Sequence, residues 1–309
     1  MAETTGIEWA DRTWSPWVGC QRVSPACDHC YAEAWAKRSG LVQWGPHAER
    51  RRTSDDYWKR PHAWNRQAAR EGRSLRVFPS LCDPFDNQVP EEWREDFWAL
   101  IHDTPQLDWL LLTKRPQNIA RMLPPGWMQD EPWPWPNVWL GTTAENQAEA
   151  DRRIPHLLAV PAAVRFLSCE PLLGPIEIVS SLSCECHDAV NDFTRRSDGI
   201  HWIIAGGESG PGARPSHPDW FRSLRDQCAA FGVPYFHKQN GEWAVYYDRD
   251  REDPDWRRCP RADRRGELYL NLAGGQGFHG DRVVAMRRVG KARAGAMLDG
   301  REHREFPHA

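Results

Sequence analysis

Asp108-Trp-Leu-Leu-Leu-Thr113 is the stretch that decides the fold, because a short unbroken apolar run is typical of a strand buried on both faces, as in a parallel sheet. Runs of this kind recur along the chain, and their starts lie 27 to 36 residues apart. The full set is 76–82, 108–113, 137–142, 164–169, 200–206 and 233–237. We predict that each run is a β-strand.

Helical patterns lie between these runs. Pro90, Glu91 and Glu92 suit the first turn of a helix, and large apolar residues follow at helical spacing as far as Ile101. The segment 217–232 repeats the same device, with a proline near its start and a glycine at its end. Strand and helix therefore alternate about every 30 residues, which is the βα repeat of an α/β protein.

A further strand near residues 13–18 brings the count to about six to seven. We therefore predict an α/β fold, a full or partial (βα) barrel of parallel strands over residues 1–241. The βα pattern is lost afterwards, so residues 242–309 are predicted to be a C-terminal extension packed on the barrel. Two segments interrupt the repeat: a Trp- and Pro-rich irregular loop at 124–136 and an inserted loop at 180–199.

The composition narrows the class of protein. Apolar residues make up 40% of the 309 residues, which is enough for a real core, and no apolar run approaches the length of a membrane span. Nine cysteines are an odd number that does not suit a complete disulfide framework. We expect a soluble cytoplasmic protein with reduced thiols and no membrane partner; the sequence leaves its oligomeric state open.

Three of these cysteines, Cys20, Cys27 and Cys30, fall within eleven residues, and a short helix is predicted directly behind them at 31–39 with a glycine stop at Gly40. The N-terminus of such a helix favours thiolates that bind a metal. A structural zinc site normally has four protein ligands, whereas three cysteines leave one position or one iron open. The pattern therefore favours an open metal centre.

Other interpretations of the cysteines remain. The trio could hold a structural zinc with His29 or a remote fourth ligand, or it could consist of small core residues. Cys184, Cys186 and His187 form a second grouping, which Cys259 could join, although their spacing is a poor match to usual zinc sites.

Polar residues follow the predicted strands, at the carboxyl ends where parallel α/β folds gather their active sites. These residues are Asp83, Lys114, Arg115, Glu145, Asn146, Glu170, Glu208, Ser209, Lys238, Gln239 and Asn240. Their recurrence predicts a shared pocket. Ser168 adds a hydroxyl at one strand end, and Gly206 and Gly207 would allow close approach of a ligand to bare backbone, with a tight structural turn as the alternative.

The cysteine motif and the barrel together resemble the radical S-adenosylmethionine (radical SAM) superfamily, in which three cysteines after the first barrel strand hold a 4Fe-4S cluster. The half Cys27-Asp-His-Cys30 looks like the second and third cysteines of that motif, with an aromatic side chain before the last. This chain departs from the usual pattern in two ways. Six residues rather than three separate Cys20 from Cys27, and no Gly-Gly-Glu follows the second strand.

More closely, nearly the whole chain is similar to a phage-associated family of three-cysteine-motif proteins, mostly of unknown function. The shared segments are 7–14, 27–32, 112–116, 166–174 and 206–214. This match is specific but carries little biochemical knowledge.

The superfamily resemblance implies a radical SAM iron-sulfur enzyme that cleaves SAM reductively to a 5′-deoxyadenosyl radical, with an external electron donor of flavodoxin or ferredoxin type. Cys20, Cys27 and Cys30 would ligate the 4Fe-4S cluster. The candidate SAM contacts are Asp83, Ser168, Glu170, Gly206, Gly207 and Glu208. The candidate catalytic residues are Lys114, Glu145 and Lys238.

The phage association favours nucleic acid as the substrate, through base modification or DNA lesion repair. The segment 249–305 has 14 basic and 10 acidic residues, which is compatible with DNA as a partner. A flipped base would suit aromatic groups such as those of the Trp-rich loop. The alternatives are a zinc-stabilised nucleic-acid-binding module without turnover and a radical maturase that acts on a peptide.

Overall fold

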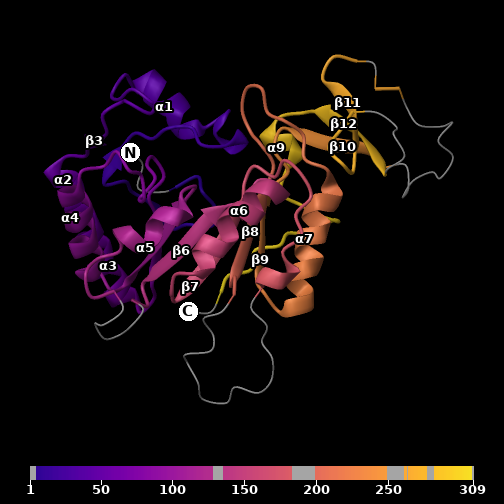
Figure 1. Cartoon of the computed structure of the whole chain (residues 1–309). Coiled ribbons are helices and arrows are strands. Elements are labelled where there is room, and N and C mark those ends of the chain that lie inside the picture. The colour runs from indigo at the N-terminus through magenta and orange to yellow at the C-terminus, as the bar shows by residue number, and fades with distance from the viewer. Residues whose placement is uncertain are drawn as a thin grey trace.

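The computed structural model describes residues 5–127, 135–182, 199–248, 261–262, 264–276 and 282–307. Its centre is a sheet of seven strands in the order β1-β4-β5-β6-β7-β8-β9, and every neighbouring pair is parallel (Figure 1). The strands are β1 (Arg12–Thr13), β4 (Leu75–Phe78), β5 (Leu107–Thr113), β6 (Val138–Thr143), β7 (Val164–Cys169), β8 (Trp202–Gly206) and β9 (Tyr235–Gln239). The predicted α/β fold is confirmed as a half-barrel, since no pairing among the described residues joins β9 to β1.

Helices lie between most consecutive strands of the seven-stranded sheet, as the βα repeat predicts; between β7 and β8 the described residues contain only a 3-10 turn. The helices are α1 (Tyr31–Ser39), α2 (Asp55–Trp58), α3 (Arg60–Glu71), α4 (Glu91–His102), α5 (Ile119–Met122), α6 (Gln147–Leu158), α7 (Pro218–Phe231) and α9 (Lys291–Ala294). Short 3-10 turns occur at η1 (Pro25–Cys27), η2 (Pro116–Asn118) and η3 (Val179–Ser181). The predicted glycine stops are confirmed, because Gly40 and Gly232 end α1 and α7 in the left-handed conformation. None of the described helices has the length and apolarity that a membrane crossing requires.

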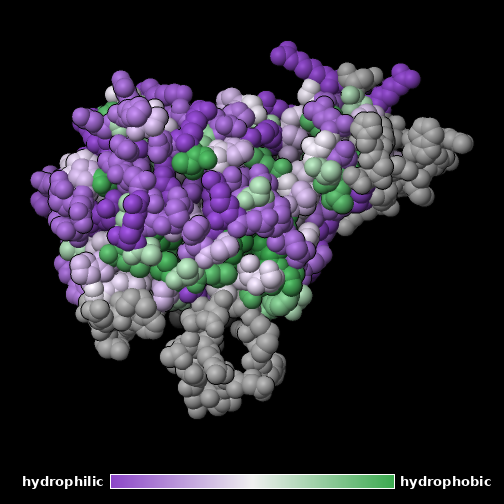
Figure 2. All heavy atoms as spheres, viewed as in Figure 1, coloured by the Kyte–Doolittle hydropathy of each residue, from purple (hydrophilic) through white to green (hydrophobic). Residues whose placement is uncertain are grey.

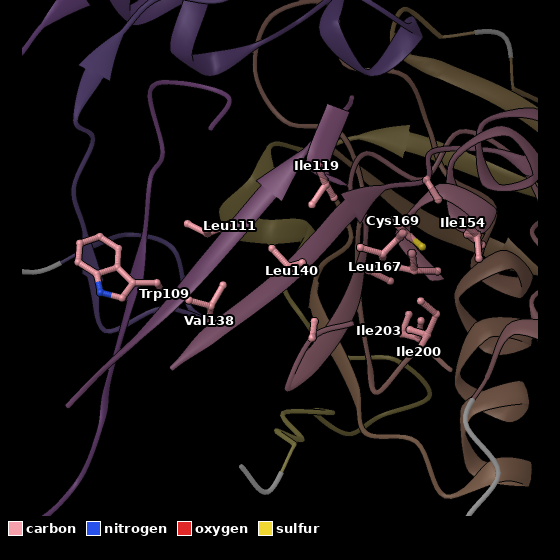
Figure 3. Packing of buried hydrophobic residues seen from close by; sticks show 14 of the residues in the cluster. Trp109, Leu111, Ile119, Val138, Leu140, Ile154, Leu167, Cys169, Ile200 and Ile203 are labelled. Carbon is pink, nitrogen blue, oxygen red and sulfur yellow. The ribbon is translucent and has the colours of Figure 1, made fainter. Parts of the chain in front are cut away.

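The outer face of the sheet carries the main core. Trp109, Leu111, Leu140, Leu167 and Ile203 alternate along four strands and point toward the helical layer (Figure 3). The helices complete this layer with apolar residues of α4, α6 and α7, which are Phe97, Ile154 and Leu224. Cys169 lies in the same layer and is fully buried.

The inner face of the half-barrel has a second core made mainly of aromatic side chains. Its members include Trp9, Phe78, Trp139, Phe166, Trp202 and Phe236. The ring of Phe166 occupies the space that a Cβ at Gly141 would need, so the interior is filled at this level. Burial of such side chains contributes roughly 1.5–3 kcal/mol each. Within the half-barrel, the described residues therefore leave ligand space on the side of this aromatic floor where the strands have their carboxyl ends.

The C-terminal segment runs along the free edge of β9. Arg304 forms an antiparallel bridge with Phe236, and Phe306 packs against Trp202 in the aromatic floor. The guanidinium of Arg76, on β4, lies 3.8 Å from the ring centroid of Phe306. The tail thus connects β9 to β4 across the open side of the half-barrel.

Two smaller antiparallel sheets accompany the half-barrel. One pairs β2 (Trp17–Val18) with β3 (Arg51–Arg52), and the other has the order β10 (Trp243–Asp248), β12 (Val283–Arg288), β11 (Glu267–Asn271). Trp243 Nε1 donates to the carbonyl of Ala213 at 2.8 Å, so the three-stranded sheet touches the loop after β8. The domain boundary at 241/242 stays a prediction.

The two predicted irregular segments lie mostly outside the described residues, which omit 128–134 and 183–198. The described tryptophans of the first segment, Trp127 and Trp135, pack against Trp98 near the amino end of β6. On the face shown in Figure 2, hydrophilic residues cover the upper part around α1, and hydrophobic residues form a band lower down.

Candidate functional site

A cavity of about 220 Å³ opens at the carboxyl ends of the parallel strands. Cys20, Cys27 and Cys30 all line it, together with a fourth thiol, Cys82. Seven of the predicted site residues line it as well. They are Asp83, Lys114, Ser168, Glu170, Gly207, Glu208 and Lys238. The structure therefore brings the cysteine motif and the strand-end residues to one place.

The three motif cysteines sit on different local structures. Cys20 follows β2, Cys27 ends the η1 turn, and Cys30 is the N-cap residue of α1. The predicted helix behind the last cysteine is therefore confirmed. All three are free thiols. As the N-cap residue, Cys30 lies at the end of α1 that carries the unpaired backbone N–H groups.

Glu145 holds the cysteine loop from below instead of facing the cavity. Its Oε1 accepts a hydrogen bond from the Ala26 N–H at 3.2 Å, and its Oε2 pairs with Arg153 at 2.8 Å. Burial raises the pKa of this carboxyl, but Arg153 and the hydrogen bonds outweigh burial and hold the pKa below its usual value. Glu145 is fully buried and does not line the cavity, so its geometry fits loop positioning rather than the predicted catalytic role.

Glu208 forms a second clamp on the same loop. Its Oε1 accepts from Arg214 at 2.6 Å, and its Oε2 lies 3.0 Å from Nδ1 of His29. Arg214 also reaches Asp28 at 3.1 Å and donates to the Pro25 carbonyl at 2.8 Å. Burial raises the pKa of Glu208, but Arg214 overcomes this and lowers it. Although Glu208 lines the cavity, its oxygens are engaged within the protein.

Asp83 is likewise engaged with protein groups. Its Oδ2 pairs with Arg115 at 2.7 Å, and its Oδ1 accepts from the Thr113 hydroxyl at 2.6 Å. Arg115 in turn donates to Sγ of Cys20 at 3.6 Å. Burial raises the pKa of the Cys20 thiol to about 12, and the Asp83 charge adds to this while Arg115 opposes it. A metal that binds here would have to displace the proton of Cys20.

Glu170 and Lys238 form an ion pair on the cavity wall. Their charged atoms, Oε1 and Nζ, lie 3.1 Å apart, and the other oxygen of Glu170 accepts from Trp9 Nε1 at 3.1 Å. Lys114 also lines the cavity and makes no ion pair with a described residue. These residues offer one anion and two cations to a ligand.

Two hydroxyls face the cavity from neighbouring strands. Ser168 on β7 and Thr143 on β6 are both almost completely buried. The Thr143 Oγ1 has no hydrogen-bond partner among the described residues. A buried hydroxyl without a partner is costly, so this atom marks a place where a bound ligand would gain a hydrogen bond.

The predicted role of the glycine pair is not what the packing favours. A Cβ at Gly207 would collide with the carbonyl oxygen of Asn240, and one at Gly206 would lie 2.8 Å from Glu170 Oε1. Gly206 does not line the cavity. The close approach at both glycines is made by the chain itself, through Glu170 at Gly206 and the backbone of Asn240 at Gly207.

The donor set fits a thiolate-bound metal in its chemistry, because three soft ligands face one cavity beside a helix N-terminus. As the described residues are placed, no three His, Cys, Asp or Glu side chains are grouped closely enough to hold a metal ion. A bound cluster would therefore have to draw the three sulfurs together. Cys184, Cys186, His187 and Cys259 lie outside the described residues.

Sequence reasoning missed several residues of this site. Trp9 precedes the first strand and carried no signal of its own. Cys82 is the last residue of a predicted strand, and Thr143 lies just beyond the predicted end of another. Strand-end position was the one signal that could have identified these two, as it did for Arg115, which lines the cavity as predicted.

Comparison with known families places the chain without giving it a function. The chain belongs to the family described as "Protein of unknown function (DUF5131)", whose model matches residues 4–307. No curated protein and no solved structure matches the chain.

Proposed function

We propose that this chain is a radical SAM enzyme whose Cys20, Cys27 and Cys30 hold a 4Fe-4S cluster. The observation that supports this most is the cavity, which all three cysteines line together with the strand-end residues of a parallel half-barrel. Active sites of parallel α/β folds lie at these strand ends. Three cysteine ligands leave one iron free to bind a small molecule.

The chemistry supplied by the bound cluster would be the one-electron cleavage of SAM to methionine and a 5′-deoxyadenosyl radical. The protein's own contribution is to bind and orient. Lys238 and Glu170 present a cation and an anion that suit a zwitterionic ligand, and Ser168 and Thr143 add hydroxyls. The aromatic floor below excludes water from the inner end of the cavity.

The clamps on the cysteine loop serve the same proposal. Glu145 and Glu208 tie the η1 turn to the ends of β6 and β8, so the loop is held at the rim of the cavity. Cys20, Cys27 and Cys30 on this loop would hold the cluster at the cavity that Glu170 and Lys238 also line. We assign positioning roles to Glu145, Glu208 and Asp83, and ligand contact to Ser168, Glu170, Lys114 and Lys238.

For the substrate we propose nucleic acid, modified at a base or repaired at a lesion. The support for this is the resemblance to a phage-associated family and the basic excess of the C-terminal segment. Trp127 and Trp135 do not line the cavity, so base stacking by these two residues is not part of the proposal. The enzyme would work in the cytoplasm with an external electron donor of flavodoxin or ferredoxin type.

The test is anaerobic reconstitution of the full chain with iron and sulfide, followed by incubation with SAM and a reductant. We expect about four irons and four sulfides per chain and formation of 5′-deoxyadenosine. Reconstituted protein that holds iron but leaves SAM intact would contradict the proposal. Salt-dependent binding to DNA tests the substrate class separately. If the protein does not bind DNA at low salt, DNA is excluded as the substrate.

One observation favours a second candidate, a zinc-stabilised nucleic-acid-binding module without turnover. Cys82 supplies a fourth thiol to the same cavity, and four protein ligands are what a closed structural zinc site uses. The variant Cys82→Ser separates the two candidates. Loss of bound zinc would favour the binding module, whereas an unchanged iron content would favour the three-cysteine cluster.

A further inference from the structure

Arg115 is a buried cation in direct contact with a cysteine of the motif. Its Nη1 lies 3.6 Å from Cys20 Sγ, and its Nη2 donates to the Gln21 carbonyl at 3.3 Å. Only 4% of the residue is exposed. Among the hydrogen bonds of the described residues, this is the one that a charged side chain donates to a motif sulfur.

The guanidinium is fixed by a set of bonds centred on Asp83. The Arg115 N–H donates to the Thr113 hydroxyl at 2.9 Å, and that hydroxyl donates to Asp83 Oδ1. The N–H groups of Phe85 and Lys114 also donate to the Asp83 carboxylate, at 3.0 and 3.2 Å. A buried charge must be paired and hydrogen-bonded, and Asp83 provides both for Arg115. The orientation of the guanidinium toward Cys20 is therefore built into the fold.

The neighbouring cations are placed differently. Lys238 on the cavity wall pairs with Glu170, Lys114 lines the cavity without an ion pair to a described residue, and Arg214, which does not line the cavity, is shared between Glu208, Asp28 and the Pro25 carbonyl. None of these side chains has a hydrogen bond to a cysteine among the described residues. Arg115 is thus placed differently from the cations that suit a ligand or clamp the loop.

We propose that Arg115 is a positioning residue that raises the reduction potential of the iron-sulfur cluster ligated by Cys20. The inference rests on the proposed function. Reduction adds one electron, and therefore one negative charge, to the cluster. An N–H donor and a positive charge beside the ligating sulfur stabilise the more negative form, and hydrogen bonds to sulfur are an established determinant of cluster potential.

Asp83 acts in the opposite direction. Its carboxylate oxygen Oδ2 lies 2.7 Å from Arg115 Nη1, so its negative charge offsets part of the positive field that the guanidinium exerts at Cys20. The reduction potential therefore depends on both charges of the Arg115–Asp83 pair. Removal of the cation should lower the potential, and removal of the anion should raise it.

The experiment measures the midpoint potential of the reconstituted full chain by anaerobic redox titration, with the reduced cluster followed by electron paramagnetic resonance. We expect Arg115→Gln to shift the ratio of reduced to oxidised cluster at least tenfold toward the oxidised form at fixed potential. This is a decrease of about 59 mV for a one-electron couple. Asp83→Asn should shift the ratio toward the reduced form.

Arg165→Gln is the matched control. It removes another buried guanidinium, which donates to the Val160 carbonyl. Arg165 lies at the amino end of β7, whereas the motif cysteines lie at the carboxyl ends of the strands. The potential of this variant should equal that of the unaltered protein. Thermal unfolding of each variant identifies any loss of fold.

The two substitutions make opposite predictions, which a purely structural role would not produce. Unchanged potentials, or shifts of both variants in the same direction, overturn the inference while leaving the proposed function intact. If Arg115→Gln does not assemble a cluster, the Asp83→Asn variant decides the question. The inference is overturned if the potential of that variant does not rise. Failure of the unaltered chain to bind iron would overturn both proposals.

Discussion

The two ends of the half-barrel interior differ sharply although the same strands build both. At the amino end the inward-facing residues are Trp139, Phe166, Trp202 and Phe236, which fill the space and are covered by the C-terminal tail. Two to four residues further along the same strands, the inward-facing residues are Thr143, Ser168, Gly206 and Lys238. The comparison teaches that one end of each strand serves stability and the other leaves a polar cavity for chemistry.

The strongest test of this division is to remove the motif cysteines. The triple variant Cys20→Ala, Cys27→Ala, Cys30→Ala should lose all cluster-bound iron and all 5′-deoxyadenosine formation. Its thermal unfolding should change little, because the fold is held by the aromatic floor and the outer core. Cys228→Ala, which alters a core thiol on α7 away from the cavity, should retain iron. Deoxyadenosine formation by the triple variant would contradict the assignment of the chemistry to the cysteines at the carboxyl ends of the strands.

The opposite end is tested by Trp202→Ala. Trp202 is fully buried and contacts Trp9, Trp139, Phe166, Phe236 and Phe306, so its removal leaves a large cavity. We expect a loss of about 3–5 kcal/mol in the free energy of unfolding, measured by denaturant titration. Protein that remains folded should still bind iron. A variant with unchanged stability but no iron would show that the floor belongs to the site.

A smaller effect is expected from pH, through His237 on β9. Burial, with Asn240 opposing and the His303 and Arg304 charges adding to it, lowers the pKa of His237 to about 4 from an ordinary value near 6.5. Between about pH 6.5 and about pH 4, His237 is therefore protonated in the unfolded chain but not in the folded chain. The free energy of unfolding falls as the pH decreases from about 6.5 to about 4. Other buried groups also contribute to acid unfolding, so His237→Gln provides the reference.

The measurement is the difference in unfolding free energy between pH 7 and pH 5. This difference should be smaller for His237→Gln than for the unaltered chain. Equal differences would show that His237 is not a source of the acid sensitivity. His237 points away from the cavity, whereas the next residue, Lys238, lines it, so the effect should concern stability and not the site.

The smallest expected effect comes from Thr143→Val, which removes the unpartnered hydroxyl at similar volume. The ligand-free protein should keep or slightly gain stability, because a buried unpaired donor is removed. Binding of SAM, measured by calorimetry, should weaken by roughly 1 kcal/mol if the ligand bonds this hydroxyl. Ser168→Ala tests the second cavity-facing hydroxyl in the same way. Unchanged affinity in Thr143→Val would place the ligand elsewhere in the cavity.

Much of the fold could be predicted from the sequence because its signals are local. The six apolar runs correspond to β4 to β9 within about two residues at their ends, except that the run at 76–82 extends four residues beyond β4. The strand predicted near 13–18 shares only Thr13 with β1, and Trp17–Val18 form β2 of a different sheet. Helix α1 begins behind Cys30 and ends at Gly40, as its cap residues indicate. The smaller sheets were not predicted, since the short strands β2 and β3 and the β10–β12 segment lack a strong alternating pattern.

The candidate site could be predicted only in part. Strand-end position correctly indicated which part of the sheet would carry polar groups, and most of the predicted residues do line one cavity. It gave no means of separating side chains that face the cavity from those that clamp the cysteine loop. Glu145 and Glu170 have equivalent positions after neighbouring strands, yet the first is bonded beneath the loop and the second lies on the cavity wall.

The sequence by itself determined the positions of most strands, the βα repeat, the helix behind the cysteines and the polar character of the strand ends, because periodicity, caps and glycine stops act between near neighbours. Only the tertiary structure decided the partners of the charged groups. Ala26 meets Glu145 across 119 residues, Cys20 meets Arg115 across 95, and Pro25 meets Arg214 across 189. Such pairs form where the packed half-barrel brings strand ends together, and no local pattern encodes which of them will meet.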